Sequence, residues 1–251
     1  LGVQSFQQEL LTVCGRAHTM DDTRRALDIV HRVRPEVWSL DLMGGLPGQT
    51  RAQWQSSLDA TVAAEPDHVS VYDLQVEEGT LFGKKYTPGE APLPPEGEAA
   101  EYYRMASASL GGAGLEHYEV SNYARPGAQC RHNLVYWRNQ PYYALGVGAA
   151  SYLGERRFSR PRRMKDYAAW VDRLAQRGGG GRVGSAGAAY SEAQQDDSHE
   201  QLLDAIMLGL RLAEGLDLAH LRARHGAPAV SSLLEGLLEA EAAGLARGLG
   251  P

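Results

Sequence analysis

The sequence predicts an α/β fold of parallel strands joined by helical crossovers, followed by a small, mostly helical domain. Residues 1 to about 75 alternate short apolar strands with amphipathic helices in the order β-α-β-α-β, a pattern typical of parallel strands. A glycine-rich run at 178–181 interrupts the chain, and apolar residues at helical spacing return after it. We therefore expect a first domain at 1–177, a flexible linker at 178–198 and a helical domain at 199–251.

Composition limits the class of protein. The 251 residues, 43% apolar and 22% charged, can bury a full core and exclude collagen-like or coiled-coil structure. The net charge of −6 argues against a nucleic-acid partner, because such a surface needs a dense stripe of Lys and Arg. No uninterrupted apolar run reaches about 18 residues, so we expect no membrane span.

The chain contains two cysteines, Cys14 and Cys130, far apart in the sequence. This spacing gives neither a disulfide framework nor a CxxC metal clip, and it favours a reducing compartment. An iron–sulfur cluster needs several thiolates close together, so we expect no metal site within this chain. The opening residues, Leu1 to Phe6, have the pattern of the inside of a strand, and we expect an N-terminal part of a larger protein to precede them.

The elements follow in order. A capping-box pattern at 19–22 starts a helix that Pro35 ends. Strands are expected at 37–43 and 68–74, with a crossover helix between them. A helix at about 96–114 precedes a loop-rich stretch with short strands at 115–160. Helices follow at about 163–177, at 202–210, at 217–225 and at 228–244. Two apolar stripes carry the helices of the first part: Ala26, Ile29, Val30 and Val33 in one, Trp54, Leu58 and Val62 in the other.

In the strand at 37–43, the period of two places Leu40 and Leu42 on one face and Ser39 and Asp41 on the other. A carboxylate that points into a parallel barrel must be paired or bind a ligand, because an unpaired buried charge costs several kcal/mol. A structural ion pair with an arginine explains Asp41 equally well, and both interpretations stay open here.

Other candidate groups are weaker when taken singly. The glycine-rich run at 44–50 is neither GxGxxG nor a P-loop, and a tight strand-to-helix turn explains it better than a phosphate cradle. Gln4 and Arg16 have the character of ordinary surface residues, and the carboxylates of Glu77 and Glu78 fit a solvated turn. No barrel lysine or His/carboxylate triad supports a lyase, since Lys84 and Lys85 lie in a loop.

The segment His132-Asn133-Leu134-Val135-Tyr136-Trp137 is the most unusual short stretch. It combines one imidazole, a common axial ligand of haem iron, with two aromatic rings that can flank a flat macrocycle. A lone histidine beside aromatic residues is more often a structural residue. Cys130, two residues upstream, adds only a single thiol.

Taken together, these segments resemble the HemW-type radical S-adenosylmethionine (SAM) proteins, relatives of oxygen-independent coproporphyrinogen III oxidase. The resemblance covers about residues 1–170 strongly. It rests on ordered motifs: LGVQSF at 1–6, GRAH at 15–18, DLMGGLPGQT at 41–50, HVSVY at 68–72, EEGT at 77–80, HYEVSNYA at 117–124, HNLVYW at 132–137 and LGVGAAS at 145–151.

The resemblance implies the C-terminal half of a partial (β/α)₆ radical SAM barrel. The CxxxCxxC loop and the glycine-rich SAM motif of the family are absent here, so a [4Fe–4S] cluster is expected only in the full-length protein. By position, the side chains of Gln4, Arg16 and Asp41 match SAM contacts of the family, with backbone contacts near Gln75 and Ala150. No catalytic residue and no metal ligand is assigned within the chain.

The HNxxYW segment separates two branches of the family. HemW-like members are regarded as haem chaperones, and the intact segment favours that function, with His132, Tyr136 and Trp137 contacting haem and a haem-acceptor protein as partner. The alternative is an oxidase-like enzyme of porphyrin biosynthesis that binds a porphyrinogen; whether the chain is an enzyme stays open. We expect a cytoplasmic protein, with a mitochondrial or plastid location as the alternative.

Overall fold

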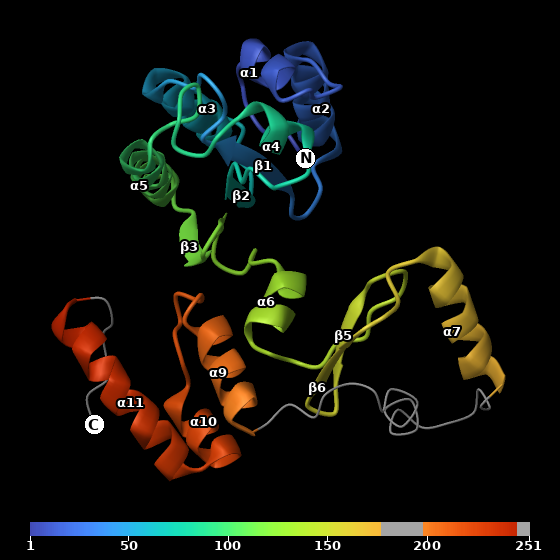
Figure 1. Cartoon of the computed structure of the whole chain (residues 1–251). Coiled ribbons are helices and arrows are strands. Elements are labelled where there is room, and N and C mark those ends of the chain that lie inside the picture. Colours follow the sequence, from blue (N-terminus) through green and yellow to red (C-terminus); the bar gives the residue numbers. More distant parts are fainter. Residues whose placement is uncertain (177–197, 245–251) are drawn as a thin grey trace. The chain divides into compact units, whose positions relative to one another are not determined.

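The computed structural model describes residues 1–176 and 198–244 and divides into two compact units, Leu1–Cys130 and Arg131–Pro251 (Figure 1). The predicted linker at 178–198 lies, apart from its last residue, outside the described residues. The first unit contains α1 (Gln8–Val13), α2 (Met20–Val33), β1 (Ser39–Gly44), α3 (Arg51–Ala63), β2 (His68–Asp73), α4 (Leu81–Lys85), α5 (Glu96–Gly112), β3 (Glu116–Glu119) and β4 (Asn122–Ala124). The second contains α6 (Arg131–Trp137), β5 (Ala150–Leu153), β6 (Arg156–Ser159), α7 (Met164–Gln176), α9 (Ser198–Gly209), α10 (Leu218–His225) and α11 (Ala227–Ala242).

The first unit is built on an open four-stranded sheet in the order β1-β2-β4-β3. Strands β1 and β2 are parallel, with α3 as their crossover, and β4 then pairs antiparallel with both β2 and β3. The N-terminal segment runs parallel to β1, where the Gln4 amide donates to the Asp41 carbonyl at 2.7 Å and Met43 donates to the Gln4 carbonyl at 2.8 Å. The predicted α/β architecture is therefore present, whereas the strand expected at the N-terminus is reduced to an isolated parallel bridge between Gln4 and Leu42.

One face of this sheet forms the main core. Leu40 and Leu42 of β1 are fully buried and pack with Trp54 and Leu58 of α3. The Trp54 indole donates to the Tyr102 carbonyl of α5 at 2.9 Å, so the two helices that cover this face are joined by a buried hydrogen bond. The polar face of β1 is thereby directed away from α3 and α5.

Helix α2 begins as the sequence predicts but buries little. Thr19 and Asp22 form the capping box, and Arg34, with φ of 50°, ends the helix just before Pro35. The predicted apolar stripe lies on the surface of the described chain, with Ile29 50% and Val33 70% exposed. The periodicity thus predicted the helix correctly, but it gave no information about what covers its apolar face.

The second unit contains the antiparallel β5–β6 hairpin and the cluster of α9, α10 and α11, whose core is Leu202, Ile206, Leu221 and Val230. Helix α6 is a difference from the sequence prediction, which placed it in a loop-rich stretch. Its seven residues include Val135 and two aromatic residues of modest helix propensity, so local sequence gave no helix signal. No helix in the described ranges is long and apolar enough to cross a membrane.

Candidate functional site

The two faces of β1 separate packing from polar chemistry. Its residues alternate strictly, so that Leu40 and Leu42 are buried while Ser39, Asp41 and Met43 are half-buried on the opposite face. This confirms the prediction that Asp41 lies on the face of the strand opposite Leu40 and Leu42. A carboxylate on this face is close to other polar groups of the sheet and away from the apolar core.

Gln4 lies beside Asp41 because Gly2 leaves room for both side chains. A Cβ atom at Gly2 would stand 3.0 Å from Gln4 Nε2 and 3.9 Å from Asp41 Oδ2, so a larger residue would push the Gln4 amide aside. Gln4 has φ of 68°, a left-handed conformation that its backbone hydrogen bonds to β1 hold in place. The structure thus brings an amide and a carboxylate together at the edge of the sheet.

Arg16 lies on the turn after α1, where its amide donates to the Leu11 carbonyl at 3.0 Å. The turn that carries it is held to the N-terminal segment by His18, whose Nε2 contacts the Val3 carbonyl oxygen at 3.3 Å. The Arg16 side chain is exposed, and no hydrogen bond joins it to Gln4 or Asp41 within the described residues. Its charge opposes the effect of burial, which raises the pKa of the Cys14 thiol. Its role at the site stays a prediction.

Gln75 and Ala150 lie in different units. Gln75 is exposed, two residues beyond β2, where the Leu74 amide donates to the Gly44 carbonyl at 3.0 Å and ties this end of β2 to β1. Ala150 is the first residue of β5 in the second unit. The expected backbone contacts of both residues stay predictions.

The glycine-rich run between β1 and α3 is a tight strand-to-helix turn, as interpreted from the sequence. Gly48 has φ of +76°, and its amide donates to the Pro92 carbonyl at 2.7 Å. The Gln49 side-chain oxygen accepts from the Leu46 amide at 3.2 Å. Because these backbone groups are satisfied within the protein, the turn offers few free donors for a phosphate.

A row of polar side chains crosses the sheet in register with Asp41. We call it the polar row: Asp41 pairs with Ser70 of β2, Ser70 with Asn122 of β4, and Asn122 with Glu119 of β3. Paired residues point to the same face of a sheet, and Ser70, Asn122 and Glu119 are buried. The Asn122 amide donates to Glu119, while its Oδ1 atom is buried without a hydrogen-bond partner.

Sequence reasoning did not assign Ser70, Asn122 or Glu119 to the site. A signal for Ser70 was present, because it alternates with Val69 and Val71 as Asp41 alternates with its apolar neighbours. Asn122 and Glu119 carried no comparable signal. Their alignment depends on an irregular register between β3 and β4, which shifts between His117 and Glu119.

His68 occupies the same face of the sheet as Asp41. Its Nδ1 contacts Ser39 Oγ at 3.1 Å, and its Nε2 contacts the Tyr118 hydroxyl at 2.9 Å. Burial lowers the pKa of His68, and the negative charge of Asp41 opposes this shift in part. The imidazole is therefore held neutral by its surroundings and fixed by two partners.

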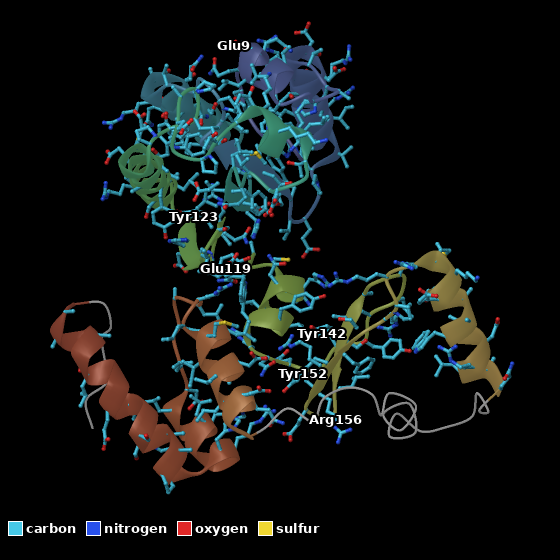
Figure 2. The ribbon with its side chains drawn as sticks, viewed as in Figure 1. Glu9, Glu119, Tyr123, Tyr142, Tyr152 and Arg156 are labelled. Carbon is cyan, nitrogen blue, oxygen red and sulfur yellow. The ribbon has the colours of Figure 1, made fainter. Side chains whose placement is uncertain are left out.

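The HNxxYW segment forms helix α6, and the structure separates its aromatic residues onto two faces. His132 is exposed, and its Nε2 contacts the Tyr136 hydroxyl at 3.2 Å. The Tyr136 ring packs edge-to-face on Tyr142, with 4.6 Å between ring centroids. Tyr142 in turn lies next to Tyr152 of the β5–β6 hairpin, as Figure 2 shows.

Trp137 follows Tyr136 directly and so lies about 100° further around the helix. Its ring lines a cavity in the second unit and has the Arg211 guanidinium 5.5 Å from its centroid. His132 and Tyr136 do not line this cavity. The three residues that the sequence grouped together therefore serve two separate surfaces of one short helix.

The side chains of this chain fit one of the two cofactors expected from the resemblance, SAM, and do not fit the other, a [4Fe–4S] cluster. Gln4 and Asp41 fit SAM, since Gly2 leaves an amide and a carboxylate free to form directed hydrogen bonds. A [4Fe–4S] cluster does not fit, because the sequence has two cysteines in total. No group of three or more potential metal ligands occurs among the described residues. Glu77 and Glu78 are exposed, as expected for a solvated turn.

Comparisons with known proteins agree with this fold. The family model "HemN C-terminal domain" matches residues 196–247. The solved structure of Escherichia coli coproporphyrinogen III oxidase (HemN), described as a radical SAM enzyme, superimposes with a TM-score of 0.70 at 18% identity, covering 95% of this chain and 54% of that one. The chain therefore has the fold of HemN over most of its length, and its C-terminal helices match the HemN C-terminal domain.

Sequence relatives narrow the class. "Heme chaperone HemW" of Synechocystis sp. is 46% identical over 88% of this chain and 51% of its own length. "Radical S-adenosyl methionine domain-containing protein 1, mitochondrial" of Danio rerio is 31% identical over 88% of this chain and 49% of its own length. The chain is thus homologous to proteins named heme chaperone HemW, which confirms the resemblance of its motifs, and it spans about half the length of these relatives.

Proposed function

We propose that the protein is a haem chaperone of the HemW type, which binds haem and SAM and passes haem to acceptor proteins. The observation that carries the proposal is helix α6, where an exposed His132 imidazole is oriented by the Tyr136 hydroxyl at 3.2 Å. The printed name of the Synechocystis relative, "Heme chaperone HemW", supports the same function.

Each residue of α6 has a distinct task in this proposal. His132 offers an imidazole nitrogen to the haem iron. Because Tyr136 already contacts Nε2, coordination through that atom requires the hydroxyl to turn away, whereas coordination through Nδ1 leaves the contact intact. The rings of Tyr136 and Tyr142, packed edge-to-face, supply an apolar surface for the macrocycle. Trp137 supplies a further apolar contact from the opposite face of the helix.

SAM is assigned to the first unit. The Asp41 carboxylate would accept from ribose hydroxyls, and the Gln4 amide would donate to and accept from polar edges of the ligand. Arg16 would move onto the SAM carboxylate, with backbone contacts at Gln75 and Ala150. In this class, SAM supplies a 5′-deoxyadenosyl radical when a cluster is bound. The two cysteines of this chain do not supply the thiolates that such a cluster needs.

Haem titration of the full-length protein tests the proposal. His132→Ala should weaken haem binding and change the Soret band, because the iron loses a ligand. The matched control is His31→Ala, since His31 is also exposed, its Nε2 contacts the Ala64 carbonyl oxygen at 3.1 Å, and its ring meets the Trp38 ring edge-on. If the two variants bind haem with equal affinity and identical spectra, His132 is not the ligand.

A second candidate function is an oxidase-like activity on a porphyrinogen, which the fold similarity to HemN favours. Consumption of coproporphyrinogen III by the reconstituted full-length protein would establish it, and haem binding without turnover would exclude it. We place the protein in the cytoplasm. The mitochondrial name of the Danio rerio relative makes that organelle the alternative.

A further inference from the structure

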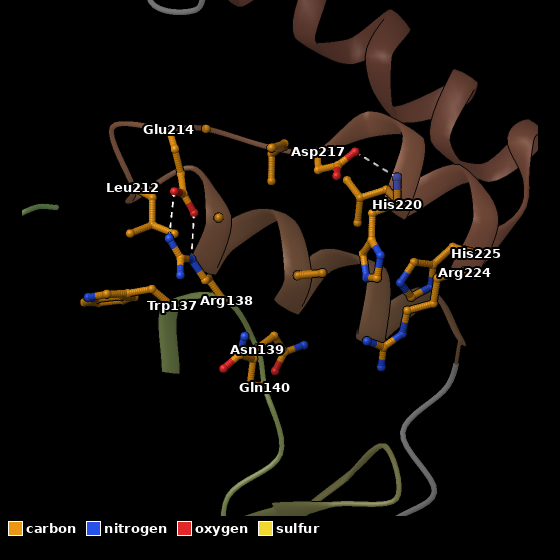
Figure 3. Close-up of a pocket in the computed structure, with 15 residues that line it drawn as sticks. Trp137, Arg138, Asn139, Gln140, Leu212, Glu214, Asp217, His220, Arg224 and His225 are labelled. Carbon is orange, nitrogen blue, oxygen red and sulfur yellow. Dashed lines mark hydrogen bonds and ion pairs between the residues drawn. The ribbon is translucent and has the colours of Figure 1, made fainter. Parts of the chain in front are cut away.

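The second unit contains a cavity of about 570 Å³ that the sequence did not predict. It lies between the end of α6, helix α10 and the connection from α9 to α10, as Figure 3 shows. Its walls include Trp137, Arg138, Leu212, Glu214, His220 and His225. A volume of this size is typical of sites for drug-sized and cofactor-sized ligands.

Ion pairs and hydrogen bonds hold the walls of the cavity in place. Arg138 makes two hydrogen bonds to the Glu214 carboxylate, at 2.8 and 2.9 Å, and so joins the end of α6 to the connection between α9 and α10. Arg224 reaches the Tyr152 hydroxyl at 3.1 Å and the Glu155 carboxylate at 3.2 Å. Because both arginines are paired with carboxylates, the cavity is not an unbalanced basic pocket for a simple anion.

Two imidazoles are the reactive groups that remain. The side chains of His220 and His225 lie close together on α10 (Figure 3). His220 is exposed and lines the cavity, and its ring makes no hydrogen bond within the described parts of the chain. His225 is half-buried behind it, and burial, followed by the charge of Arg224, lowers its pKa. Among the described residues, no hydrogen bond occupies the His220 ring or the His225 Nε2 atom, so a nitrogen of each is available to a ligand.

Trp137 forms a flat aromatic wall of the same cavity. One side of its ring carries Arg211 at 5.5 Å from the centroid, and its indole N–H is buried without a hydrogen-bond partner. Arg211 forms no ion pair with a described carboxylate, so its charge is available to an acidic group at the rim. The cavity therefore combines an aromatic wall and an accessible imidazole, and the Arg211 guanidinium packs on the Trp137 ring without itself lining the cavity.

We propose that this cavity binds an iron porphyrin, with His220 as an axial ligand of the iron, Trp137 against the macrocycle and Arg211 near a propionate. The inference rests on the proposed function, since it assumes that the protein carries haem, and it adds a site separate from His132. Helix α6 then serves haem on two faces: His132 and Tyr136 on one, Trp137 on the other.

The test is ferric haem titration of the full-length protein, with His220→Ala, His132→Ala and the His31→Ala control compared side by side. His220→Ala should weaken binding at the cavity at least about tenfold, since loss of groups around a metal site costs that much or more. Because His220 is exposed, this variant keeps the core intact. Imidazole added to it should restore part of the wild-type Soret spectrum.

Tryptophan fluorescence locates the bound haem. Trp137→Phe should remove more of the haem-induced quenching than Trp170→Phe on α7, because only Trp137 lines the cavity. Wild-type affinity, spectrum and Trp137 quenching in His220→Ala would overturn the inference. An effect of His132→Ala alone would overturn it too, while supporting the proposed function. Absence of haem binding in the wild-type protein would instead refute the proposed function itself.

Discussion

The polar row of the first unit and the histidine cavity of the second are organised in opposite ways. The row lies on neighbouring strands, and each side chain is placed by backbone pairing with the next. The cavity is lined by residues from α6, α9, α10 and the connections next to them, which are distant in sequence. The row therefore depends on hydrogen-bonded register, whereas the cavity depends on how helices pack.

The cores that support the two sites differ as well. The first unit buries a continuous cluster in which Leu58, like Trp54, is fully buried. Among the described residues, the buried members of the helical cluster are Leu202, Ile206, Leu221 and Val230. We conclude that the sheet is the more rigid support for a ligand site and that the helical site adapts more easily to its occupant.

The largest expected effect is on these cores. Leu58→Ala should lower the free energy of unfolding by about 2–5 kcal/mol, in the upper part of that range. The side chains around Leu58 are closely packed and cannot collapse into the space that the substitution leaves. Leu221→Ala, whose side chain already lines a cavity, should fall in the lower part of that range. Hydrogen exchange resolved on peptides of each unit measures both, and equal losses in the two units would contradict the comparison.

The same contrast explains what the sequence could predict. Period-two alternation placed Asp41 opposite Leu40 and Leu42, and the structure confirms it, since the two faces of a strand follow from local geometry. Helix starts with a capping box, as at Thr19, were equally accessible. The pairing of Asn122 with Glu119 and the meeting of Trp137 with His220 in one cavity depend on tertiary packing, which no local pattern contains.

The second prediction tests the row as a ligand site. Asp41→Asn should weaken SAM binding to the full-length protein about ten- to a hundredfold, which corresponds to roughly 1.5–3 kcal/mol for a charge-assisted hydrogen bond. Asp59→Asn is a matched control, because Asp59 is exposed on α3 and accepts from Gln55. Calorimetric titration measures both. Unchanged affinity in Asp41→Asn, with the fold intact, would remove Asp41 from the site.

The third prediction compares the caps of one helix in each unit. Thr50 accepts from the Gln53 amide at 3.2 Å and completes a capping box on α3, while Asp217 accepts from the His220 amide at 2.9 Å on α10. Either residue changed to alanine should cost about 1 kcal/mol. Only Asp217→Ala should also alter haem affinity, because it loosens the turn that carries His220. Chemical denaturation and haem titration separate the two effects, and a haem defect in Thr50→Ala would contradict this assignment.

The smallest effect is a loss of stability at acid pH, and it concerns the two histidines with lowered pKa, His68 in the sheet and His225 beside the cavity. An ordinary histidine pKa is about 6.5. Because folding lowers the pKa of each, the folded state binds fewer protons than the unfolded state below that pH. The stabilisation is therefore fully present above about pH 6.5 and declines as the pH falls through the folded-state pKa.

Unfolding measured between pH 7.5 and 5 checks this sign. Replacing His68 with Gln should flatten the loss of stability toward acid pH in the first unit, and His225→Gln should do so in the second. Added salt should reduce the His225 contribution more, because the charge of Arg224 is among its causes whereas no positive charge lowers the pKa of His68. If the dependence of stability on pH were equally insensitive to salt in both units, burial alone would lower the pKa of His68 and of His225. That result would contradict the proposed electrostatic difference between the two histidines.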